Sequence, residues 1–239
     1  MRIPMMRFET ISDCNYDCEM CAHGPMRLRP FLLTLDQLQI FLEVTKESGY
    51  FIEDFRMHGI GEPLLWPHLK EGLEMVRQSG VIGHVFMATN GAAANKVDAS
   101  TWDLIDECRI SLYGDNKIKN HANYLKKVYP EKITVDEPEN FAALPKAGES
   151  RPIPCDCRCR GPMFYGDKIF LYCGPPIFGA ADAMGLDAEK DNDLWVPVQK
   201  NYMDLAKPNK IGNLKYCSTC WGNSAYLDMV KVSTDGGNW

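Results

Sequence analysis

The sequence lacks any apolar run of the roughly 18 residues that a bilayer-spanning helix requires. The amino terminus carries a charge at Arg2, but no apolar segment of a signal peptide follows it. A basic stripe is also missing, since the net charge is −6 and the pI is about 5.4, which speaks against a nucleic-acid partner. No internal repeat or low-complexity tract is present. We therefore expect a cytoplasmic globular protein without membrane contact.

Composition is ordinary apart from cysteine. The 239 residues are 45% hydrophobic and 24% charged, which is enough to bury one good core and a small additional module. Ten cysteines would indicate disulfides in a secreted chain. Their clustering, in a chain without a secretion signal, favours iron–sulfur ligation in a reducing compartment instead.

Three of these cysteines lie close together near the amino terminus. Cys14, Cys18 and Cys21 are spaced C-x3-C-x2-C after a short β-like run. Three thiolates at this spacing can bind three irons of a [4Fe–4S] cluster and leave the fourth iron without a protein ligand. An open metal position can hold a small molecule, as catalytic metals do. The alternative is a zinc site that takes His23 as its fourth ligand.

Three further motifs lie at or near the ends of predicted strands, and the first of them follows a short apolar-alternating segment. Residues 54–64 end in Gly59-Ile-Gly61-Glu62-Pro63, where glycines let the backbone approach a ligand. Carbonyls and a carboxylate in such a loop suit an ammonium group. Residues 84–91 end in Thr89-Asn90-Gly91, and residues 109–114 contain Ser111.

These four motifs, in this order, resemble those of the radical S-adenosylmethionine (SAM) superfamily. The resemblance implies a [4Fe–4S] cluster whose open iron binds SAM, and an external electron donor such as flavodoxin or ferredoxin. Met20 stands where the superfamily commonly has an aromatic residue against the adenine, and a thioether can also pack against a purine. The superfamily's glycine-isoleucine motif near the fifth strand is not recognisable. The SAM-binding residues that the resemblance implies are Met20, Gly59, Gly61, Glu62, Pro63, Thr89, Asn90 and Ser111.

The first half of the chain alternates predicted strands and helices. Such β-α units predict a parallel sheet with right-handed crossovers, whose active site lies at the carboxyl ends of the strands. The superfamily core usually has six strands and six helices. We therefore predict an α/β fold, a partial (β/α) barrel shortened to about five strands and four helices. The predicted strands are residues 8–12, 55–58, 85–89, 109–112 and 133–135, and the predicted helices are residues 34–48, 67–79, 97–105 and 117–128.

A proline-rich stretch separates the two halves of the sequence. Pro138, Pro145, Pro152 and Pro154 make it typical of a linker. We therefore predict a barrel domain over residues 1–138, a linker over 139–154 and a cysteine-rich domain over 155–239. Within the last, residues 163–173 predict a β-hairpin with a Gly-Asp turn, and residues 222–230 predict a closing helix.

A second set of cysteines lies in this carboxyl-terminal part. Cys173, Cys217 and Cys220, together with one cysteine from Cys155, Cys157 and Cys159, would supply the four ligands of a closed [4Fe–4S] cluster. A structural zinc site is the alternative. The layout resembles the Twitch domain, a shortened relative of the SPASM domain that carries one auxiliary cluster. The Twitch pattern favours Cys155 as the first ligand, since Pro154-Cys155 lies about eighteen residues before the cysteine that follows the hairpin. The resemblance thus implies two [4Fe–4S] clusters.

The size and layout resemble superfamily dehydrogenases that oxidise a secondary alcohol to a ketone, of which 2-deoxy-scyllo-inosamine dehydrogenase is one. In Twitch and SPASM relatives the auxiliary cluster is thought to accept an electron from the substrate radical. We therefore expect a radical SAM oxidoreductase acting on a small polar molecule. Maturation of a ribosomally made peptide is one alternative, and a non-catalytic iron–sulfur module is another. Glu9, His58 and Tyr113 lie at or near strand ends and are candidate catalytic residues.

Overall fold

The computed structural model describes residues 1–16, 18, 30–113, 116–137, 140–142, 162–171, 178, 181, 184–205 and 229–231. The predicted adenine contact Met20 and most of the predicted cluster ligands lie outside these residues, namely Cys21, Cys155, Cys157, Cys159, Cys173, Cys217 and Cys220. Most of the predicted linker also lies outside them, so the division into two domains stays a prediction.

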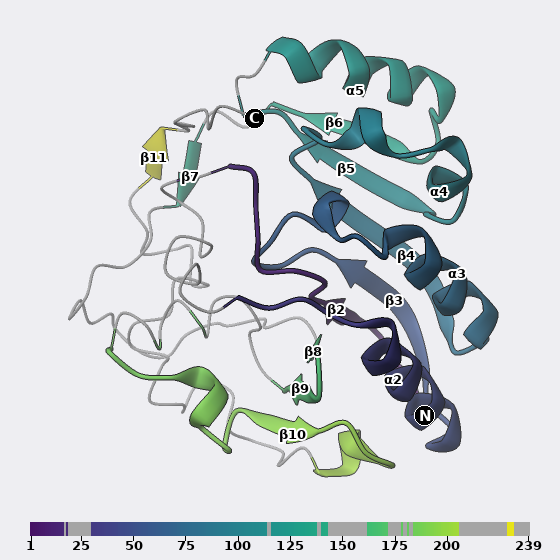
Figure 1. Cartoon of the computed structure of the whole chain (residues 1–239), viewed down its shortest axis with the longest axis vertical. Coiled ribbons are helices and arrows are strands. Elements are labelled where there is room, and N and C mark those ends of the chain that lie inside the picture. Colours follow the sequence, from purple (N-terminus) through teal and green to yellow (C-terminus); the bar gives the residue numbers. More distant parts are fainter. Residues whose placement is uncertain are drawn as a thin grey trace.

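A nine-stranded, mostly parallel sheet forms the centre of the molecule (Figure 1). Its order is β10-β9-β8-β2-β3-β4-β5-β6, and β1 pairs in addition with β3. Neighbours from β2 to β6 are parallel, as predicted from the β-α units. The strands are β1 (Arg2–Ile3), β2 (Met6–Phe8), β3 (Phe51–Met57), β4 (Ile82–Thr89), β5 (Glu107–Ser111), β6 (Ile133–Asp136), β8 (Met163–Tyr165), β9 (Lys168–Phe170) and β10 (Trp195–Pro197). The predicted α/β fold, a partial barrel, is confirmed.

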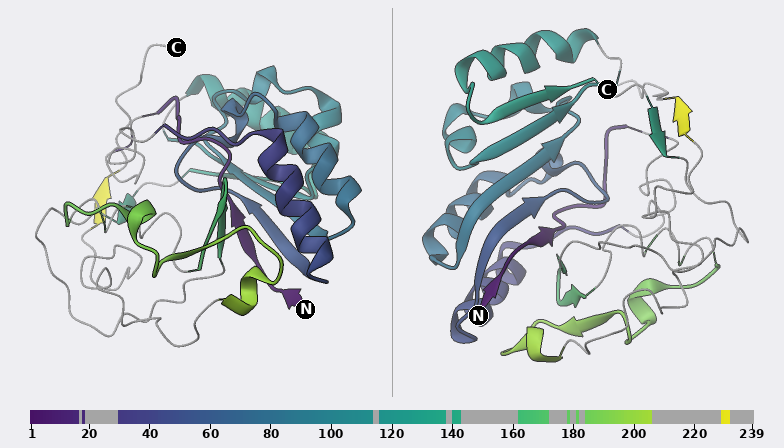
Figure 2. Two further views of the ribbon diagram at one scale, coloured as in Figure 1. Left: turned by 60° about the horizontal axis from the view of Figure 1, so that its bottom comes forward. Right: turned by 180° about the vertical axis from the view of Figure 1, so that it is seen from behind.

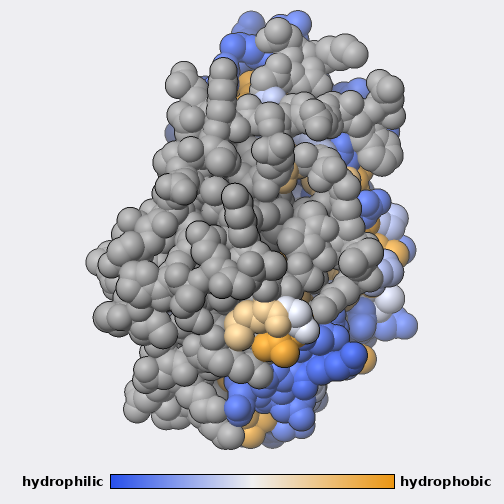
Figure 3. Space-filling model, turned by 90° about the vertical axis from the view of Figure 1, so that its left-hand side faces the viewer, coloured by the Kyte–Doolittle hydropathy of each residue, from blue (hydrophilic) through white to orange (hydrophobic). Residues whose placement is uncertain are grey.

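The helices lie on one side of this sheet (Figures 1 and 2). They are α2 (Leu35–Glu47), α3 (Leu69–Ser79), α4 (Ala99–Asp103) and α5 (Asn116–Val128). A capping box between Thr34 and Gln37 begins α2, and Gly80 ends α3 with a φ of 69°, a left-handed conformation that glycine adopts without steric cost. None of the described helices is long and apolar enough to cross a membrane. On the side away from the helices, the described residues that reach the surface are mostly hydrophilic (Figure 3).

An aromatic core joins the sheet to α2. Phe8 of β2 lies 4.6 Å from Phe55 of β3, and Phe41 of α2 lies 4.1 Å from Phe164 of β8, measured between ring centroids. All four side chains are buried. The predicted hairpin is confirmed: it consists of β8 and β9 around a Gly166-Asp167 turn. Because β8 also pairs in parallel with β2, this hairpin extends the sheet of the barrel.

Two predicted elements are wrong in part. The first strand ends at Phe8, since the chain then leaves the sheet and residues 10–12 exchange backbone hydrogen bonds with residues 31–33. The end of the predicted closing helix is instead strand β11 (Met229–Lys231), which pairs with β7 (Asn140–Ala142) in a separate two-stranded sheet. A partner strand distant in sequence satisfies the backbone groups of residues 229–231 there.

Candidate functional site

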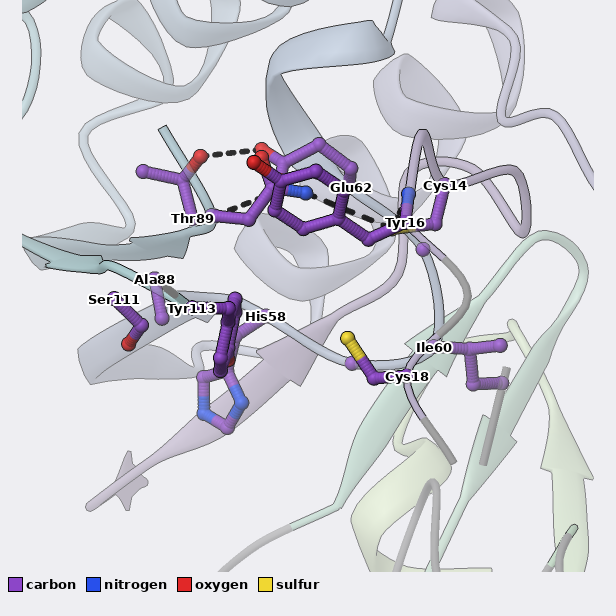
Figure 4. A pocket seen from close by; sticks show the side chains of 13 residues that line it. Cys14, Tyr16, Cys18, His58, Ile60, Glu62, Ala88, Thr89, Ser111 and Tyr113 are labelled. Atoms are coloured by element: carbon purple, nitrogen blue, oxygen red, sulfur yellow. Dashed lines mark hydrogen bonds between the residues drawn. The ribbon is translucent and has the colours of Figure 1, made fainter. Parts of the chain in front are cut away.

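A pocket of about 340 Å³ lies at the carboxyl ends of β3, β4 and β5, beside the loop that follows β2 (Figure 4). Parallel strands end at the same edge of a sheet, so the residues that follow them meet there. The lining residues are Cys14, Tyr16, Cys18, His58, Gly59, Ile60, Gly61, Glu62, Ala88, Thr89, Asn90, Ser111 and Tyr113. The structure thus brings together residues from all four sequence motifs.

The cysteine loop contributes two side chains, Cys14 and Cys18, which are both half-buried. The Cys14 sulfur accepts a hydrogen bond from the Tyr16 backbone N–H at 3.4 Å and another from Asn90 Nδ2 at 3.7 Å. Hydrogen bonds to the charged form of an acid favour that form, and the thiolate is the form that binds metals. The surroundings of Cys14 therefore suit a metal-binding thiolate.

The glycine loop packs tightly against the elements beneath it. A Cβ atom on Gly61 would lie 1.8 Å from the Ile11 carbonyl oxygen, and one on Gly59 would lie 1.9 Å from the Glu9 carboxylate. Both distances are far below van der Waals contact. The two glycines are therefore required for close packing between the loop and the segment after β2, whatever ligand the loop binds.

Glu9 supports this loop from below and is not among the residues that line the pocket. Its side chain is buried and accepts hydrogen bonds from the backbone N–H groups of Ile60 at 2.6 Å and Gly61 at 3.3 Å. Burial raises the pKa of the Glu9 carboxyl to about 8, although the backbone hydrogen bonds act in the opposite direction. In the described structure Glu9 holds the position of the Gly59–Gly61 backbone.

The raised pKa of Glu9 predicts a pH-dependent stability. Its ordinary value is 4.5 and its folded value about 8, so between these values the folded state holds a proton that the unfolded chain has lost. The contribution of Glu9 to the free energy of unfolding is therefore fully present below about pH 4.5. It falls as the pH rises towards about 8, by up to about 1.4 kcal/mol per pH unit. Glu9→Gln removes the titration. The free energy of unfolding of the wild type, minus that of the variant, should therefore decrease between about pH 5 and pH 8 in urea unfolding followed by circular dichroism; a constant difference would contradict the shift.

Glu62 ties the glycine loop to the end of β4. Its buried carboxylate accepts hydrogen bonds from Thr89 Oγ1 at 2.5 Å, from the Asn90 N–H at 2.8 Å and from the Leu64 N–H at 3.1 Å. Burial is the main influence on the pKa of Glu62 and raises it. Pro63, the next residue, is buried in the 3-10 turn η1 (Pro63–Leu65) and does not line the pocket. Glu62 thus serves as a brace between two strand ends and also lines the pocket.

His58 and Tyr113, two candidate catalytic residues, both line the pocket. Burial, followed by the charges of Arg7 and Arg56, lowers the pKa of His58 to about 3, so its imidazole is neutral near pH 7. The Tyr113 ring lies edge-on to Tyr16, with centroids 6.2 Å apart. Ser111, at the end of β5, lines the pocket beside Ala88 (Figure 4).

The sequence analysis missed three of the lining residues, Tyr16, Ile60 and Ala88. It also missed Asn15, which does not line the pocket but accepts a hydrogen bond from the Asn90 side chain. Tyr16 lies between two predicted metal ligands, and that position alone is a signal that its side chain approaches the site. Ala88 precedes the Thr89-Asn90 motif, and the two-residue period of a strand places it on the same face as Phe86.

The described residues fit the cofactors that the sequence implies. Cys14 and Cys18 come from the cysteine loop and share one pocket with the glycine loop and the ends of β4 and β5. The third predicted ligand, Cys21, lies outside the described residues. Thiolates are the usual ligands of iron–sulfur clusters, and a pocket of this volume beside them is within the range of small-molecule sites.

The sequence matches no protein-family model and no curated protein. Among solved structures it is similar to BtrN in an open conformation, with a TM-score of 0.55 and 16% identity over 91% of this chain and 92% of that chain. BtrN in complex with AdoMet and 2-DOIA matches over 56% of both chains, with 20% identity and a TM-score of 0.49. The structure of anSMEcpe with bound AdoMet matches over 56% of this chain and 43% of that chain, with 19% identity and a TM-score of 0.43. The last two matches span about half the length of those chains. The match to BtrN in its open conformation, over about nine-tenths of both chains, shows that this chain shares the fold of BtrN, which is a radical SAM enzyme.

Proposed function

We propose that the protein is a radical SAM enzyme that binds SAM in the pocket at the strand ends. The observation that carries the proposal is the meeting of four separate motifs in one pocket, where Cys14 and Cys18 face the glycine loop and the ends of β4 and β5. A fold alone does not define a function. Here the fold and the chemistry of the pocket agree.

A bound [4Fe–4S] cluster with an open iron would supply the electron for cleavage of SAM to a 5′-deoxyadenosyl radical, which would remove a hydrogen atom from the substrate. Cys14, Cys18 and Cys21 would hold this cluster. The backbone of residues 59–61 and the Ser111 hydroxyl offer polar groups for SAM. Neutral His58 offers a hydrogen-bond partner without positive charge at the pocket wall.

We further propose that the net reaction is the oxidation of a small polar molecule, with the carboxyl-terminal cysteines holding an auxiliary [4Fe–4S] cluster that accepts the second electron. Support comes from the likeness to BtrN, which extends over nine-tenths of both chains. BtrN is a dehydrogenase, and its complex contains 2-DOIA together with AdoMet. An external donor such as flavodoxin or ferredoxin would supply the first electron.

Anaerobic reconstitution tests the proposal directly. The wild type should carry about eight irons per chain, the sum of two cubic clusters, and with SAM and a reductant it should slowly form 5′-deoxyadenosine. A variant with Cys14, Cys18 and Cys21 all replaced by Ala should retain about four irons and form no 5′-deoxyadenosine, because only the SAM-binding cluster is lost. Iron is measured chemically and 5′-deoxyadenosine by chromatography.

The buried cysteine Cys108 provides a matched control, since it lies inside β5 and does not line the pocket. Cys108→Ala should keep about eight irons and normal 5′-deoxyadenosine formation. Zinc in place of iron in the wild type, or full 5′-deoxyadenosine formation by the triple variant, would reject the proposed function.

A further inference from the structure

We propose that Asn90 is a positioning residue that holds the Cys14 sulfur through a hydrogen bond and thereby sets the reduction potential of the cluster bound there. The proposal rests on the proposed function, because it assigns a role toward that cluster. It differs from the expectation that Asn90 serves mainly to contact SAM. The evidence is that the backbone N–H of Asn90 and both polar atoms of its side chain form hydrogen bonds.

The carboxamide of Asn90 is fixed in one orientation. Its Oδ1 accepts a hydrogen bond from the Ala92 N–H at 2.9 Å, and its Nδ2 donates to Asn15 Oδ1 at 2.8 Å and to Cys14 Sγ at 3.7 Å. Turning the amide over would place its NH₂ group against the Ala92 N–H, and two donors cannot bond each other. The NH₂ group therefore faces the Cys14 sulfur. Asn90 is only 6% exposed, so water does not replace these partners freely.

The backbone of Asn90 is fixed as well. Its N–H donates to the Glu62 carboxylate at 2.8 Å, and Glu62 also accepts from Thr89 beside it. Glu62 in turn is anchored to the cysteine loop, because its own N–H donates to the Asp13 carbonyl at 2.9 Å. The glycine loop and the Cys14 sulfur are thus connected through two residues, Glu62 and Asn90.

A donor aimed at a ligand sulfur has a defined electrostatic effect. Reduction adds negative charge to a cluster, and hydrogen bonds to its sulfurs stabilise that charge and raise the reduction potential. Such bonds are stronger when the acceptor is ionised. Among the described residues, the Tyr16 backbone N–H also donates to Cys14, and a side-chain substitution leaves it in place. Asn90 is therefore the donor whose removal can be tested.

The test is a redox titration of the anaerobically reconstituted protein, followed by electron paramagnetic resonance. The SAM-binding cluster is recognised as the one whose reduced signal changes when SAM is added. Asn90→Asp keeps the size of the side chain and the acceptor for the Ala92 N–H, but it replaces the donor by a carboxylate. In this variant we expect the midpoint potential of the SAM-binding cluster to fall by about 59 mV or more, which corresponds to a tenfold or larger change in the equilibrium constant of a one-electron reduction. Asn90→Ala should shift the potential in the same direction.

Asn15→Ala is the matched control. It removes an acceptor, the Asn15 Oδ1 atom, which lies 2.8 Å from Asn90 Nδ2 and 3.9 Å from Cys14 Sγ, and it leaves the donor to Cys14 in place. Its midpoint potential should stay at the wild-type value or rise. An unchanged potential in Asn90→Asp, or an equal fall in Asn15→Ala, would overturn the proposal and leave Asn90 a purely structural residue. If the wild type shows no SAM-responsive cluster at all, the proposed function fails first, so the two failures are distinguishable.

Discussion

Replacing Gly61 with alanine should abolish SAM binding and strongly destabilise the protein. The added Cβ would lie 1.8 Å from the Ile11 carbonyl oxygen and 2.7 Å from that of Asp13. Both are backbone atoms, which cannot rotate away as a flexible side chain does. Overpacking typically costs about 1–3 kcal/mol and occasionally more, and we expect about 3 kcal/mol here. The loop can relieve the overlap only by moving away from the cysteine loop, which opens the pocket.

Gly49→Ala is the control for this prediction. Gly49 has a positive φ of 66°, and a Cβ there would have no neighbour within 4 Å. The left-handed backbone should cost about 1–2 kcal/mol without disturbing the pocket. Urea unfolding and anaerobic titration calorimetry with SAM separate the two effects. Wild-type SAM affinity in Gly61→Ala would show that the loop does not form the SAM site.

Replacing Glu62 with alanine should have the second-largest effect. The substitution leaves three buried donors without their acceptor, on Thr89, Asn90 and Leu64. A buried donor without a partner costs about 1–3 kcal/mol, so we expect a loss of about 3 kcal/mol or more in the free energy of unfolding. SAM affinity should fall at least about tenfold, or about 1.4 kcal/mol, because the ends of β3 and β4 are no longer held together.

The graded variant Glu62→Gln should lose less, since its amide oxygen still accepts from part of this set while its NH₂ group faces one of the donors. Glu71→Ala, at an exposed position in the first turn of α3, should change stability by about 0.5 kcal/mol or less. A fall in SAM affinity with unchanged stability in Glu62→Ala would contradict the bracing role. It would indicate instead that the carboxylate binds the SAM ammonium group directly.

Local sequence signals determined the helices and the order of the motifs. Thr34 and Gln37 form the capping box that begins α2, and Gly80 ends α3, because capping depends on residues only three or four positions apart. The alternation of strands and helices also predicted the meeting of Cys14, Glu62, Thr89 and Ser111 at one edge of the sheet. That prediction succeeds because parallel strands joined by helices all end at the same edge.

The tertiary structure decided which strands pair and which polar groups form hydrogen bonds with one another. The pairing of β8 with β2 joins segments more than 150 residues apart, and no local pattern specifies the partner of a short strand. The sequence predicts Glu9 as a catalytic residue and Glu62 as a SAM-binding residue. In the structure their side-chain carboxyl groups accept hydrogen bonds from the backbone of neighbouring loops. The hydrogen bond from Asn90 to Cys14 connects residues that are 76 positions apart in the sequence. Residue type fixes what a side chain can bond, but burial and the distance between elements determine which partner it finds.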